Sequence, residues 1–351
     1  MRLLLLAWLA LPARAEDFAL KSDGVELPGV FEPAEGFAKD AAPKIAVLLH
    51  GSGPNDRDEN LAAVSDPASP CLFFRDLSAA LRKAGVSVVR YDKRSFVYRS
   101  VRKAMETPAF AAYKTHPLES TLSDAALAVA WARKRAPRAR LYLVGHSEGS
   151  YLALQTARRD RAIAGLALIG LGLTGVETAV FEQTVYRHYS LFPGLDSDGD
   201  GRLSPAELSG TEALRESLRA QLGLIDRDED GALSSDEFKG GQLSNLLMEP
   251  SPYAAFNREQ AALPSAADIL RGDAFPVAVI NGALDNQTPA YGAWAVDVAN
   301  AAVWKRANLS VRVLPGLGHA LDKRKDYGDL TFRAPDPAAL DAVAAAVAAM
   351  P

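Results

Sequence analysis

The sequence predicts an α/β fold in which a mostly parallel sheet is covered by helices on both faces and is interrupted by a helical insert. Short apolar runs of strand character alternate with segments whose apolar residues recur at helical spacing, which is typical of consecutive strand–helix–strand units. This alternation stops after Gly170 and resumes at Phe275, and the intervening residues are acidic, helical in pattern and without strand signals. A continuous domain is therefore expected to carry one inserted cap.

The expected elements follow the chain in order. Residues 16–35 alternate weakly and contain turn residues, which predicts an antiparallel hairpin. The expected strands after it cover 44–49, 86–91, 141–144, 163–169, 275–280 and 309–314. The expected helices cover 73–84, 119–135, 151–157, 290–303 and 337–349. The expected divisions are 1–15 (signal peptide), 16–171 (first part of the α/β domain), 172–268 (cap insert) and 269–351 (second part of the α/β domain).

The composition and the first residues limit the partners and the location expected for the protein. Of 351 residues, 48% are hydrophobic and 23% are charged, and the net charge is −4, so no basic excess favours nucleic acid as a partner. Residues 1–15 begin with a positive charge, continue with an apolar run too short to span a bilayer, and end in Ala13-Arg14-Ala15. This pattern predicts a secretory signal cleaved after Ala15, no stable membrane anchor afterwards, and a periplasmic or secreted protein. The alternative is a short membrane anchor.

The single cysteine and one glycine-flanked serine have different expected roles. Cys71 has no partner for an intrachain disulfide and is expected to be a small buried hydrophobe. Gly145-His146-Ser147-Glu148-Gly149 lies between an apolar strand and a helix, which is the pattern of a nucleophile elbow. The glycines relieve clashes around a strained backbone, and the helix N-terminus offers N–H groups to a developing oxyanion. The alternative is a plain turn.

A nucleophilic serine needs a base and a carboxylate that orients it. His319 follows the last strand in a glycine-rich loop, whereas the other four histidines lie in less suitable places: His50, His116, His146 and His188. Asp285 follows the preceding strand, so the order Ser147, Asp285, His319 is that of the strand–turn–helix hydrolases. The alternative for Asp285 is a turn-forming residue before Asn286.

Two backbone N–H groups are expected to form the oxyanion hole. One belongs to Glu148, the residue after the serine. The second is expected from Ser52, with Gly53 as the alternative, because the loop His50-Gly51-Ser52-Gly53-Pro54 follows an early strand and its glycines allow close approach to a carbonyl.

These segments together resemble bacterial α/β-hydrolase esterases of the secreted or periplasmic acyl-ester hydrolase type. The resemblance rests on His50–Glu59, Val89–Arg94, the elbow, Asp285 and His319. It implies an α/β-hydrolase fold, a Ser147–Asp285–His319 triad, hydrolysis of carboxylic esters with short acyl chains and no organic cofactor. A thioesterase or serine peptidase shares the same triad chemistry, and a non-catalytic calcium-binding interaction protein on this scaffold is a further alternative.

Two acidic segments of the insert match the EF-hand calcium loop. Each has Asp at positions 1, 3 and 5, Gly at 6, a backbone carbonyl at 7, Ser at 9 and Glu at 12, the spacing that wraps oxygen atoms around a hard cation. Acidic helix caps are the alternative for either segment. The expected calcium ligands are Asp196, Asp198, Asp200, Arg202, Ser204 and Glu207 in the first loop, and Asp226, Asp228, Asp230, Ala232, Ser234 and Glu237 in the second.

Three further expectations concern the insert and its surroundings. Leu203 and Leu233 are expected to meet in a short ladder between the loops, and Pro193-Gly194 is expected to break the turn before the first loop. Calcium is expected either to fix the shape of a lid or to gate it. The charged residues Asp56, Arg57, Asp58 and Arg94 are expected to form a solvated ion-pair network that braces loops at the rim of the site, and the alternative is contact with the substrate.

Overall fold

A computed structural model describes most of the chain. The described residues are 14–37, 42–183, 192–209, 215, 218–219, 222–223, 225–238 and 253–351. The predicted signal segment before residue 14 and His188 lie outside them. Within the described ranges, none of the helices combines the length and the apolar character needed to cross a membrane.

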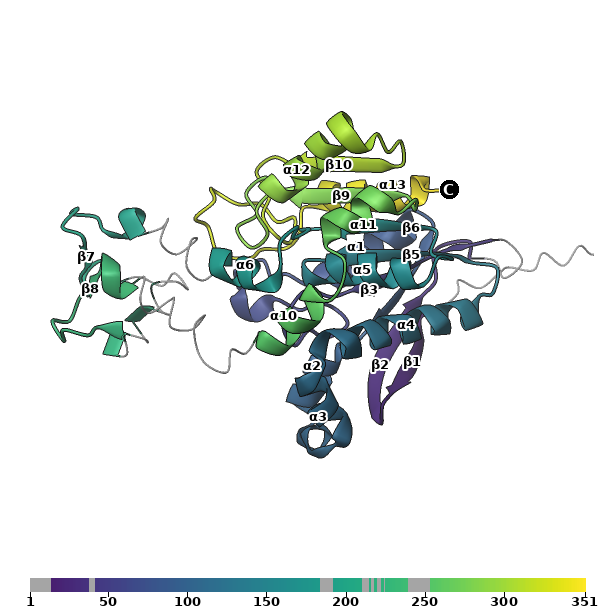
Figure 1. Ribbon diagram of the computed structural model, residues 1–351, viewed down its shortest axis with the longest axis horizontal. Coiled ribbons are helices and arrows are strands. Elements are labelled where there is room, and N and C mark those ends of the chain that lie inside the picture. Colours follow the sequence, from purple (N-terminus) through teal and green to yellow (C-terminus); the bar gives the residue numbers. More distant parts are fainter. Residues whose placement is uncertain are drawn as a thin grey trace, which may run out of the picture.

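One eight-stranded sheet forms the centre of the molecule (Figure 1). Its strands are β1 (Glu16–Ser22), β2 (Val25–Glu32), β3 (Lys44–Leu49), β4 (Val86–Tyr91), β5 (Arg140–His146), β6 (Gly165–Ile169), β9 (Val277–Gly282) and β10 (Leu309–Leu314). Their order is β1-β2-β4-β3-β5-β6-β9-β10. The β1–β2 hairpin pairs antiparallel with β4, and the remaining neighbours pair in parallel. The predicted hairpin and mostly parallel sheet are confirmed.

Helices cover both faces of the sheet, so its central strands are apolar throughout their length. One face packs against α4 (Pro117–Arg135), α5 (Glu148–Arg159), α11 (Ala266–Gly272) and α12 (Tyr291–Ala299), which share one hydrophobic core. The other face packs against α1 (Phe73–Lys83) and α13 (Pro337–Ala349), which share a second core with Cys71. Burial raises the pKa of the Cys71 thiol, and the residue is fully buried, as predicted.

Several helices lie where the sequence pattern gave no helix. These are η1 (Ala62–Val64), α2 (Arg94–Ser100), η2 (Arg102–Glu106) and α3 (Pro108–Thr115). α6 (Val176–Phe181) and α10 (Ala254–Ala261) lie within the insert, which the sequence predicts to be helical, and the π-helix η4 (Asn300–Trp304) continues α12. The start of α3 has the usual residues of a helix N-terminus. Thr107 caps it by accepting a hydrogen bond from the Phe110 N–H, and Pro108 occupies its first turn. α2 and η2 are too short to show a helical period.

The two acidic loops belong to a small unit with its own core. β7 (Arg202–Leu203) pairs antiparallel with β8 (Leu233–Ser234), and Leu203 lies opposite Leu233, so the predicted ladder is confirmed. Figure 1 shows this pair at the left, apart from the sheet, on the side where α6 lies. Its hydrophobic cluster consists of Phe192, Leu195, Leu203, Leu208, Leu218, Ile225, Leu233 and Phe238.

The prediction that Pro193-Gly194 breaks the helical turn before the first acidic loop is wrong. Residues 192–195 are helical, and the Asp196 N–H donates to the Phe192 carbonyl across Pro193 and Gly194. Proline removes only its own N–H, so a hydrogen bond that starts and ends outside that residue survives.

Candidate active site

Ser147 lies in a strained turn between β5 and α5. Its φ of 54° and ψ of −122° are unusual for a residue with a side chain, and its N–H donates to the Ile169 carbonyl at 2.8 Å. A Cβ on Gly145 would lie 2.1 Å from the Gly149 carbonyl oxygen, and one on Gly149 would lie 1.9 Å from the Leu49 carbonyl oxygen. The two flanking glycines are therefore required by close backbone packing around the serine.

Asp285 and His319 form a buried pair. The His319 Nδ1 lies 3.0 Å from Asp285 Oδ1 and 2.9 Å from Oδ2. The same carboxylate accepts the N–H groups of Gln287 at 2.9 Å and Thr288 at 2.8 Å, together with the Thr288 hydroxyl at 2.9 Å. Burial alone would raise the pKa of Asp285, but the His319 ring and these donors outweigh it and hold the pKa below its usual range. The carboxylate is therefore ionised at neutral pH and fixes the ring through Nδ1.

The histidine loop packs directly against the elbow. The His146 Nε2 lies 3.2 Å from the His319 carbonyl oxygen, and the two rings lie 4.6 Å apart between centroids. Gly170, with φ of 61°, leaves the space that the ring of His319 occupies, because a Cβ there would lie 3.0 Å from His319 Cε1. Three strand ends thus bring together residues that are far apart in the sequence.

The early glycine loop also reaches the serine. A Cβ on Gly51 would lie 3.2 Å from the Ser147 Cβ, so this loop lies against the elbow, and Ser52 follows it directly. Glu148 begins α5. A cavity of about 360 Å³ adjoins these residues and is lined by Gly53, Glu148, Tyr113 and Phe256, among others.

Sequence reasoning missed a buried carboxylate beneath the elbow. Glu59 Oε1 accepts the Gly51 N–H at 2.7 Å and lies 3.0 Å from His146 Nδ1. The His146 ring thus faces Glu59, as expected for a side chain directed away from the serine. Burial would raise the pKa of Glu59, but the charge and hydrogen bond of His146 lower it overall. In the sequence, Glu59 is one of several acidic residues after Pro54, and nothing marks it as the buried one.

The Glu59–His146 pair predicts a pH-dependent contribution to stability. Burial alone would lower the pKa of His146, but Glu59 raises it overall above 6.5, with a further contribution from the nearby Asp285. Stabilisation from the charged imidazole is then complete below about pH 6.5 and is lost as the pH rises through the folded-state pKa. Glu59→Gln is expected to lower the free energy of unfolding more at about pH 6 than at about pH 9, as measured by urea unfolding. An equal loss at both values would contradict the charged pair.

The other histidine at this edge braces the loop. His50 is buried against Phe74 and Tyr91, with ring centroids 4.9 and 5.6 Å away. Burial lowers its pKa to about 4, so the ring is neutral at neutral pH. His116, by contrast, is exposed and lies 3.2 Å from the Glu259 carboxylate.

Arg57, Asp58 and Arg94 form ion pairs, but with residues outside the expected set. Asp56 instead accepts the backbone N–H groups of Asp58 and Asn60, both at 3.1 Å. Arg57 binds the Asp92 carboxylate through Nε at 2.9 Å and Nη2 at 3.1 Å, and Asp58 pairs with Arg90. Arg94, expected at the rim, is instead buried and binds both oxygens of Asp124 at 2.6 Å. Its position as the first residue of α2, a helix that the pattern did not show, explains the error.

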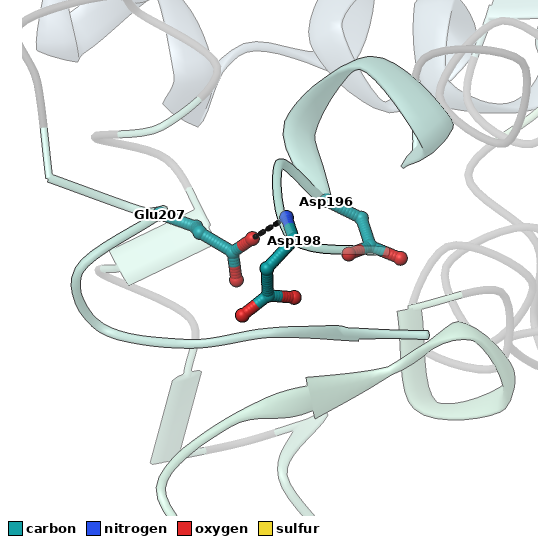
Figure 2. A group of neighbouring side chains, drawn as sticks. All are labelled: Asp196, Asp198 and Glu207. Carbon is teal, nitrogen blue, oxygen red and sulfur yellow. Dashed lines mark hydrogen bonds between the residues drawn. The ribbon is translucent and has the colours of Figure 1, made fainter. Parts of the chain in front are cut away.

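Each acidic loop gathers three carboxylates. Asp196, Asp198 and Glu207 place oxygen atoms within 4.8 Å of one another (Figure 2), as do Asp226, Asp228 and Glu237. In the first loop Glu207 Oε1 also accepts the Ser197 N–H at 2.7 Å, and Oε2 accepts the Ser204 N–H at 2.9 Å. These hydrogen bonds, foremost those from Ser204, lower the pKa of Glu207 to about 2. The equivalent bonds, foremost from Ser234, lower the pKa of Glu237 to about 2.

The other predicted calcium ligands form hydrogen bonds within the turns of the two acidic loops. Asp200 Oδ1 accepts the Arg202 N–H at 2.8 Å, and Asp230 Oδ1 accepts the Ala232 N–H at 2.9 Å. The Ser204 and Ser234 hydroxyls bond Glu207 and Glu237, so the capping-box geometry occurs within both loops. Asp226 Oδ1 is buried without a hydrogen-bond partner among the described residues. A buried acceptor of this kind, facing two more carboxylates, fits a cation.

The chain belongs to the alpha/beta hydrolase family, whose sequence pattern matches residues 46–327. The chain is 31% identical over 140 residues to the esterase EstD of Thermotoga maritima, an alignment that covers 40% of this chain and 30% of that esterase. It is also similar in structure to a proline iminopeptidase-related protein of Thermus thermophilus, with a TM-score of 0.51, 19% identity and coverage of 95% of this chain and 99% of the other. The structural likeness concerns the fold.

Proposed function

We propose that this protein is a serine hydrolase that cleaves carboxylic esters, with Ser147 as nucleophile, His319 as general base and Asp285 as the residue that orients it. The observation that carries the proposal is the buried Asp285–His319 pair, whose histidine packs against His146 of the elbow that holds Ser147 at positive φ. The partial likeness to the esterase EstD supports an ester as the substrate.

The geometry assigns a role to each group. Asp285 accepts a hydrogen bond from the Nδ1–H of His319, which leaves Nε2 free to take the proton of the Ser147 hydroxyl as its oxygen attacks the ester carbonyl. The resulting oxyanion is bound by the backbone N–H groups of Glu148 and Ser52. His319 then protonates the leaving alcohol. In the second half of the reaction His319 takes a proton from water as the water oxygen attacks the acyl-enzyme, and it returns that proton to the Ser147 oxygen as the acid leaves.

We expect the cavity beside Glu148 to hold one group of the ester. Its volume of about 360 Å³ and its aromatic lining by Tyr113 and Phe256 suit a short to medium acyl or alcohol group. A thioester or peptide bond uses the same triad, so the pocket decides between these substrates.

Fluorophosphonate labelling of the wild-type protein, followed by peptide mapping, tests the proposal. A single adduct is expected on Ser147, because the proposed mechanism gives this hydroxyl a base in His319 and two oxyanion donors. A series of nitrophenyl esters of increasing chain length is expected to give the highest kcat/KM for short to medium chains. Thioesters and peptide anilides are tested alongside. Absence of both labelling and hydrolysis by the folded, calcium-loaded protein would refute the proposal.

We also infer that the two acidic loops bind calcium and that the metal stabilises the insert. The convergent carboxylates and the unpartnered Asp226 Oδ1 support this. Bound calcium would cancel the repulsion between these carboxylates. α10, which belongs to the predicted insert, contributes Phe256 to the cavity beside Glu148, so part of the predicted insert lines this cavity. Export past the inner membrane, proposed from the signal pattern, would expose the loops to abundant calcium.

A further inference from the structure

Lys93 joins the two segments that carry the proposed oxyanion donors. It lies just after β4, is 5% exposed, and its Nζ donates to the Gly51 carbonyl at 2.7 Å and to Glu148 Oε1 at 2.8 Å. Gly51 directly precedes Ser52, and Glu148 carries the other donor. The proposed mechanism gives this buried cation no role.

The hydrogen bond to Gly51 fixes the direction of the Ser52 N–H. The Gly51 carbonyl and the Ser52 N–H belong to one peptide unit, and in a planar trans peptide they point in opposite directions. Holding the carbonyl toward Lys93 therefore holds the N–H away from it. The loop cannot rotate this peptide without breaking a buried charge-assisted hydrogen bond.

The Gly51–Ser52 peptide and the peptides on either side of it are held by further hydrogen bonds. The Asn55 Nδ2 donates to the Gly51 carbonyl at 3.1 Å and to the Ser52 carbonyl at 3.0 Å, and the Gly51 N–H donates to Glu59. A cation on the carbonyl oxygen also draws electron density from the amide, which makes its N–H a stronger donor.

We propose that Lys93 is a positioning residue that aligns and polarises the Ser52 N–H of the oxyanion hole. This inference rests on the proposed function. Lys93 also lines the cavity beside Glu148, but in this role it acts through the Gly51–Ser52 peptide and not by contact with the serine or the substrate carbonyl. Its effect is therefore expected on the transition state and on any ligand that carries an oxyanion, and much less on ground-state binding.

The test compares Lys93→Met with a matched control, Lys44→Met. Lys44 also donates its Nζ to two backbone carbonyls, those of Ala348 and Met350, far from the elbow. Lys93→Met is expected to lower kcat by roughly 10- to 100-fold with KM nearly unchanged, less than the loss of a whole donor. The affinity for an alkyl boronic acid is expected to fall by the same factor. Lys44→Met is expected to lower stability and to keep kcat.

Two further variants distinguish a positioning role of Lys93 from the effect of leaving the Glu148 carboxylate without its cation. Lys93→Arg keeps a donor for the Gly51 carbonyl and is expected to restore most of kcat. Lys93→Met/Glu148→Gln removes the unpaired carboxylate but keeps the Glu148 N–H, and the loss of kcat is expected to persist in it. If Lys93→Met does not fold, Lys93→Gln, which removes the charge and keeps a polar side chain, replaces it, and kcat and boronate affinity are expected to fall together.

The outcomes distinguish this inference from the proposed function. A wild-type protein without labelling or hydrolysis refutes the proposed function before any variant is compared. An active wild-type protein whose Lys93→Met variant retains kcat, or loses it only as much as Lys44→Met does, refutes the role of Lys93 alone. A loss that disappears in the double variant assigns the effect to the bare carboxylate and also refutes it.

Discussion

Ser147→Ala is expected to abolish ester hydrolysis and fluorophosphonate labelling, with kcat reduced by about 10⁴- to 10⁶-fold. The variant keeps the elbow backbone, the oxyanion donors and the Asp285–His319 pair, so the remaining rate reflects binding and electrostatic stabilisation without a nucleophile. Because Ser147 is only partly buried and alanine keeps its Cβ and backbone conformation, the melting temperature is expected to stay nearly the same. Initial rates on a short-chain nitrophenyl ester and calorimetry measure the two effects.

Ser150→Ala is the matched control for this prediction. The Ser150 hydroxyl is fully buried and donates to the Gly145 carbonyl at 3.0 Å and the Ile169 carbonyl at 2.9 Å. Its loss is expected to lower stability by about 1–3 kcal/mol, because two buried acceptors lose a donor, with kcat changed only a few-fold. Full activity in Ser147→Ala would refute the assigned nucleophile.

Removal of calcium is expected to unfold the insert while the sheet domain stays folded. The insert core is a small cluster of apolar side chains, and the carboxylates gathered in each loop repel one another when no cation lies between them. Titration calorimetry is expected to give two sites per chain with Kd of ~10⁻⁴–10⁻³ M. Chelation is expected to remove helical circular dichroism, to open the insert to protease and to lower esterase activity.

Variants of the second acidic loop test whether the predicted ligand positions bind the calcium. Asp226→Asn is expected to remove one site, because Asp226 supplies the buried unpartnered oxygen. Glu229→Gln is its matched control: the residue lies in the same loop with φ of 56°, outside the ligand positions, and is expected to keep both sites. Chelation that abolishes activity while the melting transition stays in place would favour gating over a structural role. Wild-type protein that binds no calcium would refute the metal sites.

The spacing of residues along the sequence was sufficient to predict the features that depend on residues close together in the chain. The strand, glycine turn and helix around Ser147 require only apolar runs and two small residues, and the calcium-loop pattern requires only oxygen ligands at fixed positions. The ladder between Leu203 and Leu233 followed from the same repeat. Short helices such as α2 were not visible, because seven residues do not establish a period, and this error placed Arg94 at the surface.

The sequence by itself determined the fold class, the elbow and the acidic loops, since these depend on interactions between residues close in the chain. The tertiary structure decided which distant groups meet: the Asp285 carboxylate on the His319 ring, Glu59 under His146, and Lys93 across the Gly51 carbonyl and Glu148. All of these residues lie at or near the carboxyl ends of parallel strands. The sheet order brings those ends to a common edge, and side-chain packing there selects one carboxylate or one lysine from several that the sequence makes equally available.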